Sequence, residues 1–363
     1  MQDQSRDMSN ATLAASAVEG EAAMYADCKT SLKATTPARA QLYAGILRKY
    51  PWPVYFEGLA QMMVYTVVAG WSWLHLYQGH SVVWALPLGW AYYCSWMIGH
   101  EAYHHTMAPS KMLNEFLGFF YMDVIMVSKK TWLVVHHEVH HRTPLRGDDR
   151  QQLFGSTVLE ETFGIIYTVF GYWYMDFVTL VQEPKLRTVV AMAVRFFILL
   201  SMPVNALVCF LFSIAVQTNY NALLVHALPV VQAGCDGPEH QVNTAIDIFP
   251  DSKLAIFLMG GVNMHCVHHV FPSLPRAKHN WGHKKLELAF GSQYRCVKDW
   301  TTLAALWVVR MQRFENPVSM AELPEMAKGR YFMQFSLDLL SVATLVGIVL
   351  CCPSATIRGL VGV

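Results

Sequence analysis

Two long stretches without a charged side chain constrain this chain of 363 residues more than any other feature. Residues 58–99 form 42 consecutive positions without Asp, Glu, Lys or Arg, and residues 196–235 form another 40. At about 1.5 Å of rise per residue, each stretch gives roughly 60 Å of helix, enough for two crossings of a ~30 Å hydrocarbon core. We therefore expect an all-α integral membrane protein with two transmembrane helical hairpins, about four spans in total.

Turn-forming residues divide these stretches. Gln78, Gly79, His80 and Ser81 predict a tight turn in the first hairpin, and Pro203 and Pro229 predict bends in the second. Residues 1–50 predict a polar, partly disordered N-terminal tail, and residues 51–300 the main domain. Residues 301–363 predict a C-terminal cytosolic segment, in which the apolar run 339–357 is a candidate for an extra membrane helix.

The basic residues flank the uncharged stretches and predict the orientation of the chain. The net charge is only +1, which excludes nucleic-acid binding driven by bulk charge. Lys and Arg residues precede the first stretch, lie between the two stretches and follow the second, but none lies in the predicted turns. Because basic residues favour the cytosolic side, we expect the N-terminus, the middle segment and the C-terminal third to face the cytosol.

Histidines gather in three short windows next to the uncharged stretches. Ten of the 16 histidines lie in HEAYHH at 100–105, HHEVHH at 136–141 and HCVHH at 265–269, and His240 follows the second stretch by five residues. On a helix, residues three and four positions apart share one face, so each window can direct several imidazoles at one point. An even number of spans separates the windows, which places all three on the predicted cytosolic side.

Nine or ten converging imidazoles exceed the roughly four ligands of one tetrahedral ion, so we expect a cytosolic helical cap that carries two metal ions. Imidazole serves iron, copper, zinc and nickel alike. A pair of ions held by histidine alone, beside apolar helices, indicates redox chemistry on a lipid chain.

Two other interpretations compete with this one. The segments 100–104 and 137–141 each match HExxH, in which two histidines bind zinc and the glutamate acts as general base in a metalloprotease. That reading leaves the remaining histidine windows without a role. A non-enzymatic metal transporter is the second alternative, but its ionisable groups would be expected among the spans rather than just outside them.

The three windows together resemble the membrane fatty acid desaturases, whose signature is three histidine boxes. HEAYHH at 100–105, HHEVHH at 136–141 and NMHCVHHVFPSLPR at 263–276 match the boxes in order, and the likeness covers roughly residues 50–300. The resemblance implies a di-iron site whose ligands would be the following histidines: His100, His104, His137, His140, His141, His265, His268, His269 and His240. His105 is the tenth candidate ligand, since box one also reads as HxxxxH, and His136 offers an alternative register within box two.

The same resemblance implies an oxidoreductase that uses O₂ to introduce a cis double bond into a fatty acyl lipid or acyl-CoA. Because no haem-binding HPGG motif is present, electrons would come from a separate carrier such as cytochrome b5 or a ferredoxin. It also implies an endoplasmic reticulum membrane. Related enzymes with the same boxes hydroxylate lipids or modify sphingolipids, sterols or carotenoids, and these reactions stay open.

Overall fold

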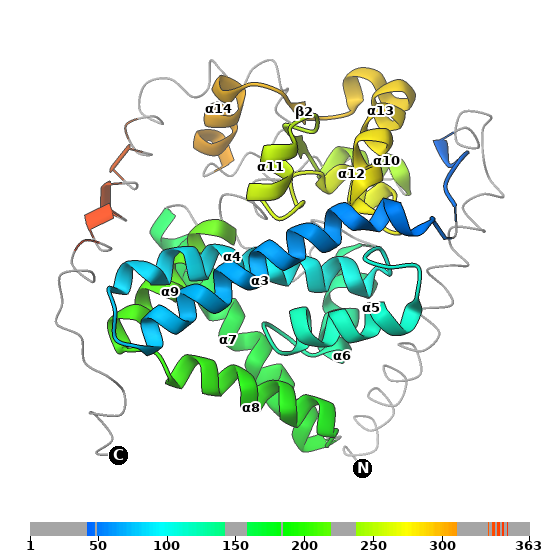
Figure 1. Ribbon diagram of the computed structural model, residues 1–363. Helices are drawn as coiled ribbons and strands as arrows, with labels where there is room; N and C mark the ends of the chain where they lie inside the picture. The colour runs from blue at the N-terminus through cyan, green and yellow to red at the C-terminus, as the bar shows by residue number, and fades with distance from the viewer. Residues whose placement is uncertain are drawn as a thin grey trace, which may run out of the picture.

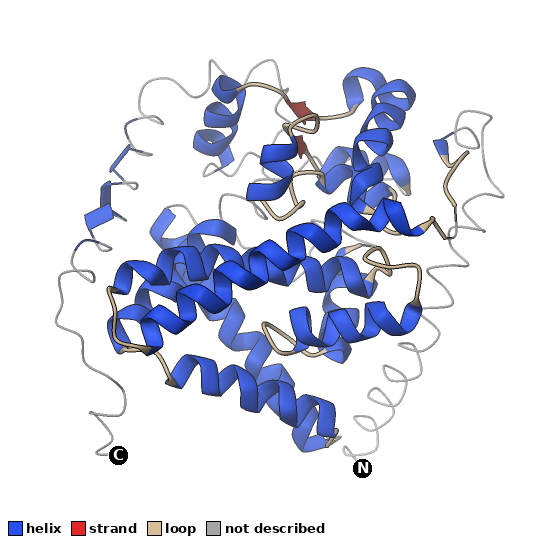
Figure 2. Ribbon diagram, in the orientation of Figure 1, coloured by secondary structure: helices blue, strands red, loops and turns tan. Residues whose placement is uncertain are grey.

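The computed structural model describes residues 42–47, 49–141, 158–182, 184–218 and 237–310, and scattered positions between 333 and 347. The predicted polar tail up to residue 41 and most of the candidate helix 339–357 lie outside the described residues. The described part is mostly helical, as expected, with one pair of very short strands (Figure 2).

A layer of helices from the first part of the chain lies beneath a smaller lobe from the later part (Figure 1). The layer contains α3 (Phe56–Tyr77), α4 (Ala85–Tyr103), α5 (Lys111–Gly118), α6 (Lys129–Trp132), α7 (Val158–Gln182), α8 (Leu186–Leu200) and α9 (Val204–Thr218). The lobe contains α10 (Pro238–Thr244), α11 (Lys253–Leu258), α12 (His265–Val270), α13 (His279–Phe290) and α14 (Trp300–Arg310). Its parallel strands β1 (Asp247–Ile248) and β2 (Cys296–Val297) pair Asp247 with Cys296.

The first uncharged stretch folds into a helical hairpin with its turn at the predicted residues. Helix α3 ends before Gly79, whose φ of 76° turns the chain, and the Ser81 side chain accepts a hydrogen bond from the Val83 amide at the next helical turn. Gly tolerates a positive φ and Ser supplies a cap, so both choices agree with the local geometry.

The second uncharged stretch differs from its predicted form. Helix α8 starts before the stretch, at Leu186, and carries Arg187 and Arg195. It ends at Leu200, and α9 begins at Val204, directly after Pro203. The break at Pro203 agrees with the predicted bend, because the proline ring clashes with the preceding helical turn and its nitrogen has no hydrogen to donate. The difference is that the helix before the break begins outside the uncharged stretch. Residues 219–236 lie outside the described residues.

Within the described ranges, no helix combines the length and the apolarity that a membrane crossing requires. Helices α8 and α9 have 15 residues each, which gives about 22 Å of rise. Helix α3 has 22 residues, but its sequence includes the polar residues Gln61, Ser72 and His75. The four spans predicted from the uncharged stretches do not appear as such among these helices.

Helix α4 lies at the centre of the layer. Its glycines have no side chain, so the neighbouring elements pack closely against it. A Cβ atom on Gly89 would lie 2.4 Å from the Ser213 side chain on α9, and one on Gly99 would lie 2.4 Å from the Tyr121 backbone. Tyr121 belongs to the π-helix η4 (Phe119–Asp123). Since α4 ends in the first histidine box, this close packing fixes the position of that box relative to η4 and α9.

Candidate metal centre

The three histidine boxes come together at the ends of three separate elements. Box one occupies the last turn of α4, and box three occupies α12 in the lobe. Box two lies on a second π-helix, η5 (Leu133–His140), which continues directly from α6.

Five histidines from all three boxes form one buried group. Ligand atoms of these residues all lie within 4.8 Å of one another, and the group consists of His100, His104, His136, His141 and His268. The Nε2 atom of His136 lies 2.8 Å from that of His100 and 3.0 Å from that of His141. The Nε2 atom of His141 lies 3.2 Å from that of His268.

Three further histidines, His140, His265 and His269, form a second buried group directly beside the first. The Nε2 atoms of His265 and His269 are 2.9 Å apart. The His269 ring stacks on the His141 ring of the first group, with 4.5 Å between centroids. Two neighbouring groups of imidazoles therefore exist, as a centre with two metal ions requires.

The π-helix explains why box two serves both groups. The His141 amide donates to the His136 carbonyl, five residues back, over 2.9 Å. The wider turn brings His136 and His141 onto one side, where both face the first group, and leaves His140 for the second. The Trp132 ring stacks on His136 with 4.1 Å between centroids and limits its rotation.

The structure brings together seven of the ten histidines predicted as ligands, and it adds His136, which the α-helical spacing had left as an alternative. Three predicted ligands lie outside both groups. His105 follows the end of α4 with a φ of 60°. His137 stacks on His104, with 4.3 Å between centroids. His240 is buried on α10.

Hydrogen bonds between the rings cannot satisfy this arrangement. A ring nitrogen offers either one proton or one lone pair, so four Nε2 atoms in a row form at most two good hydrogen bonds. Both ring nitrogens of His104 are buried without a hydrogen-bond partner among the described residues. Two nitrogens bound at right angles to one ion, each at about 2.1 Å, would lie about 3.0 Å apart, close to the separations observed here.

The electrostatics keep these rings neutral and their lone pairs available. Burial, and then the neighbouring imidazoles, lower the pKa of His104, His136 and His268 well below the usual value. Burial also lowers the pKa of His137, to about 3. Neutral imidazole is the form that binds metals, so the residues present fit a metal centre.

Polar side chains hold the outer nitrogens of the rings. The Gln241 Oε1 atom lies 2.6 Å from His269 Nδ1, and its Nε2 donates to the His141 carbonyl over 2.7 Å. Gln241 therefore links the two groups through box two and box three. Partners of this kind orient metal-binding rings.

The glutamate of box one also lies on the outer side of the rings. The Glu101 Oε1 atom lies 3.6 Å from His100 Nδ1 and 3.7 Å from His268 Nδ1, while its Oε2 accepts a hydrogen bond from Thr106. Burial raises the pKa of Glu101, but His100, His279 and Arg276 outweigh it and hold that pKa at about 2. The carboxylate lies on the Nδ1 side of these rings. The general base of a zinc protease would have to act on the opposite side, near the Nε2 atoms.

A buried aspartate from the lobe holds box three. The Asp247 Oδ1 atom accepts hydrogen bonds from the backbone amides of Cys266 and Val267 at the start of α12. Its Oδ2 accepts from the Tyr294 hydroxyl, which in turn contacts His283 Nδ1 at 2.7 Å. Sequence reasoning missed Asp247 and Gln241, because neither belongs to a box and only the fold brings them to one.

Comparison with known protein families matches residues 79–298 to a family model described as fatty acid desaturase. These are 220 of the 363 residues and include all three boxes. The chain belongs to the fatty acid desaturase family. A comparison with curated proteins gives no significant match. Membership of the desaturase family makes the chain an oxidoreductase of lipid metabolism, and its two histidine groups are compatible with the metal centre of such an enzyme.

Proposed function

We propose that this member of the desaturase family introduces a cis double bond into a fatty acyl chain, using O₂ and electrons from a separate carrier. The observation that carries the proposal is the pair of adjacent, buried groups built from histidine alone. In the proposed reaction the acyl chain loses two hydrogens, the carrier supplies two electrons, and O₂ with two protons becomes two molecules of water.

Iron is the metal proposed for both groups. A pair of iron ions, when bound, supplies the oxygen activation that removal of hydrogen from an unactivated methylene requires. The five-histidine group would hold one ion and the three-histidine group the other. Among the described residues, the second group offers three imidazoles and the first group five.

The chain's own residues keep this centre in place and dry. Gln241 and Glu101 orient rings of boxes one, two and three through their Nδ1 atoms or backbone. Seven of the eight grouped histidines are buried, which keeps bulk water from the reacting atoms. The position of Glu101, outside the ring of Nε2 atoms, argues against a zinc protease built on the HExxH match at 100–104.

The lipid surroundings of the enzyme are part of the proposal. Large apolar side chains project from helix surfaces of the layer, with Val67 and Trp71 on α3 and Phe197 on α8 each more than half exposed. Large apolar side chains that are exposed together on a protein surface mark contact with a membrane or a partner. We propose that these faces contact the lipid bilayer, with a cytosolic metal centre and the endoplasmic reticulum as its membrane.

Expression of the full chain in a desaturase-deficient yeast tests the function. New cis-unsaturated acyl chains, absent when His268→Ala is expressed at the same level, would support desaturation. A 2- or 3-hydroxylated product would replace the proposal with lipid hydroxylation, and a changed sphingolipid, sterol or carotenoid would identify another substrate class. An unchanged lipid profile together with one zinc ion per chain would overturn the proposal in favour of a metalloprotease.

A further inference from the structure

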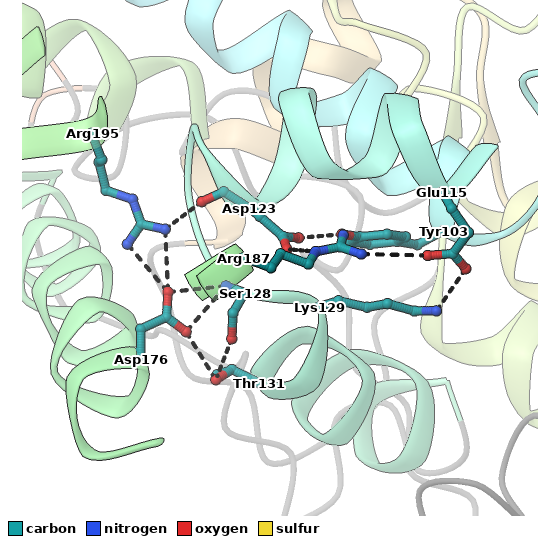
Figure 3. Close-up of polar contacts among 9 residues, drawn as sticks. All are labelled: Tyr103, Glu115, Asp123, Ser128, Lys129, Thr131, Asp176, Arg187 and Arg195. Carbon is teal, nitrogen blue, oxygen red and sulfur yellow. Dashed lines mark hydrogen bonds and ion pairs between the residues drawn. The ribbon is translucent and has the colours of Figure 1, made fainter. Parts of the chain in front are cut away.

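A second polar cluster lies beside the metal centre but contributes no histidine to it. Three acidic and three basic side chains, with Tyr103, Ser128 and Thr131, connect the ends of α4 and α6 to α7 and α8 (Figure 3). The charged members are Glu115, Asp123, Asp176, Lys129, Arg187 and Arg195. These charged residues lie between the two uncharged stretches of the sequence, yet their side chains are inside the helical layer.

Asp176 on α7 caps the start of the helix that carries box two. Its carboxylate oxygens accept the Ser128 amide at 3.0 and 3.1 Å, and Oδ1 accepts the Thr131 hydroxyl at 3.0 Å. Ser128 is the N-cap of α6, but its own side chain makes no capping hydrogen bond. The first amides of a helix need acceptors, and a carboxylate is favourable at that end. Here the cap comes from another helix.

The capped end and the histidines belong to one continuous helical segment. Helix α6 ends at Trp132 and η5 begins at Leu133, without an intervening loop. Thr131 contacts Asp176, and the next residue, Trp132, stacks on His136. A displacement or rotation at Ser128 and Thr131 therefore passes to His136, His140 and His141.

Arg195 on α8 fixes Asp176 in turn. Both terminal nitrogens of Arg195 contact Asp176 Oδ2 at 3.2 Å, and Nη2 also donates to the Asp123 carbonyl at 2.5 Å. Asp176 and Arg195 are 0 % and 1 % exposed. A fully buried ion pair often contributes no more stability than apolar residues of the same size. Stability alone therefore does not account for this pair, whereas its contacts with the box-two helix do.

We propose that Asp176, held by Arg195, is a positioning residue that sets the orientation of box two and thereby the geometry of both histidine groups. The inference rests on the proposed function, since it concerns the binding of the two iron ions. It assigns a role to two charged residues of the apolar helices α7 and α8 that lie outside all three boxes.

Ferrous iron, added anaerobically to the metal-free full-length protein, tests the proposal. Thr131→Val removes one contact with Asp176 and leaves the ion pair intact. The double variant Asp176→Leu with Arg195→Met removes the pair without leaving a lone buried charge. Tyr65→Phe is the matched control, because it removes a part-buried hydrogen bond, from the Tyr65 hydroxyl to the Phe257 carbonyl, far from box two in the chain.

We expect Thr131→Val and the double variant to weaken iron binding by about tenfold or more, the usual effect of losing a residue that supports metal ligands. Tyr65→Phe should bind two ions with wild-type affinity, and helix content and thermal midpoint should be compared for all variants. Wild-type affinity in Thr131→Val, or in a folded double variant, would overturn the positioning role. A wild-type protein that binds no iron would instead refute the proposed function.

Discussion

The Nε2 atoms of His136 and His141 lie 3.0 Å apart, although five positions separate the residues in the chain. An α-helix brings residues three and four apart onto one face. The π-helical turn makes the five-residue spacing effective and places His136 between His100 and His141 in the larger group.

Replacement of His136 should therefore weaken the binding of one metal ion. We expect His136→Ala to lower the affinity for one of the two iron ions, so that less iron is bound at limiting concentration, while His105→Ala keeps the affinity for both, because His105 lies outside the two groups. Iron per folded chain, measured after anaerobic loading, checks the expectation. The opposite pattern would assign the ligand role to His105.

Gln241 should control the affinity of both groups. Gln241→Leu removes the contact with His269 Nδ1 and the hydrogen bond to the His141 carbonyl. We expect iron affinity to fall by about 10- to 100-fold with little change in thermal stability. Asn243→Leu, on the same short helix α10, is a suitable control. Equal affinities for Gln241→Leu and the wild type would contradict the orienting role.

The metal-free protein should lose stability in acid. Burial and neighbouring rings lower the pKa of His104, His136, His137 and His268, so below pH about 6.5 the unfolded chain binds protons that the folded chain excludes. The stability from these neutral rings is present in full above that pH. As the pH falls below it, the free energy of unfolding should decrease by about 1.4 kcal/mol per pH unit for each such histidine. The loss should continue towards the pKa of His137, about 3.

Thermal unfolding of the metal-free protein between pH 7.5 and 5 measures this loss. His137→Phe removes one titrating ring, so its thermal midpoint should change less steeply with pH. A midpoint that stays constant over this range would show that the rings are not held neutral by the fold.

Two glycines of the first hairpin should respond in opposite directions to alanine. Gly99→Ala places a Cβ atom 2.4 Å from the Tyr121 backbone and should destabilise the protein by about 1–3 kcal/mol. Gly70→Ala on α3 meets nothing within 4 Å and should stabilise the helix by up to about 1 kcal/mol. Chemical unfolding at one pH compares the two. Equal effects would contradict the close packing of α4 against η4.

Sequence reasoning predicted the local features of the fold well. The helical hairpin at 58–99 followed from the missing charges, and its turn followed from Gly79 and Ser81, whose conformations are set within a few residues. The start of α8 was less visible, because Arg187 and Arg195 made this helix look unlike the apolar stretch that follows them. Only tertiary structure reveals that Arg195 is paired with Asp176 in the interior.

The candidate site was predictable in its residue type and less so in its membership. The three boxes indicated converging imidazoles, and seven predicted histidines lie in the two groups. His136 was left as an alternative because the spacing was read with α-helical geometry, and nothing in HHEVHH itself reveals a π-turn. His240 was predicted from its distance along the chain, whereas its neighbour Gln241 makes the contacts with boxes two and three.

The π-helix of box two also limits how this segment of the sequence can change in evolution. A π-turn is equivalent to an α-helix that has gained one residue, so a single-codon deletion within 133–141 could restore regular α-helical hydrogen bonding. Such a deletion would make the segment a better helix and separate His136 from His141. In a lineage that keeps the enzyme active, selection therefore has to preserve the length of this segment as strictly as its histidines.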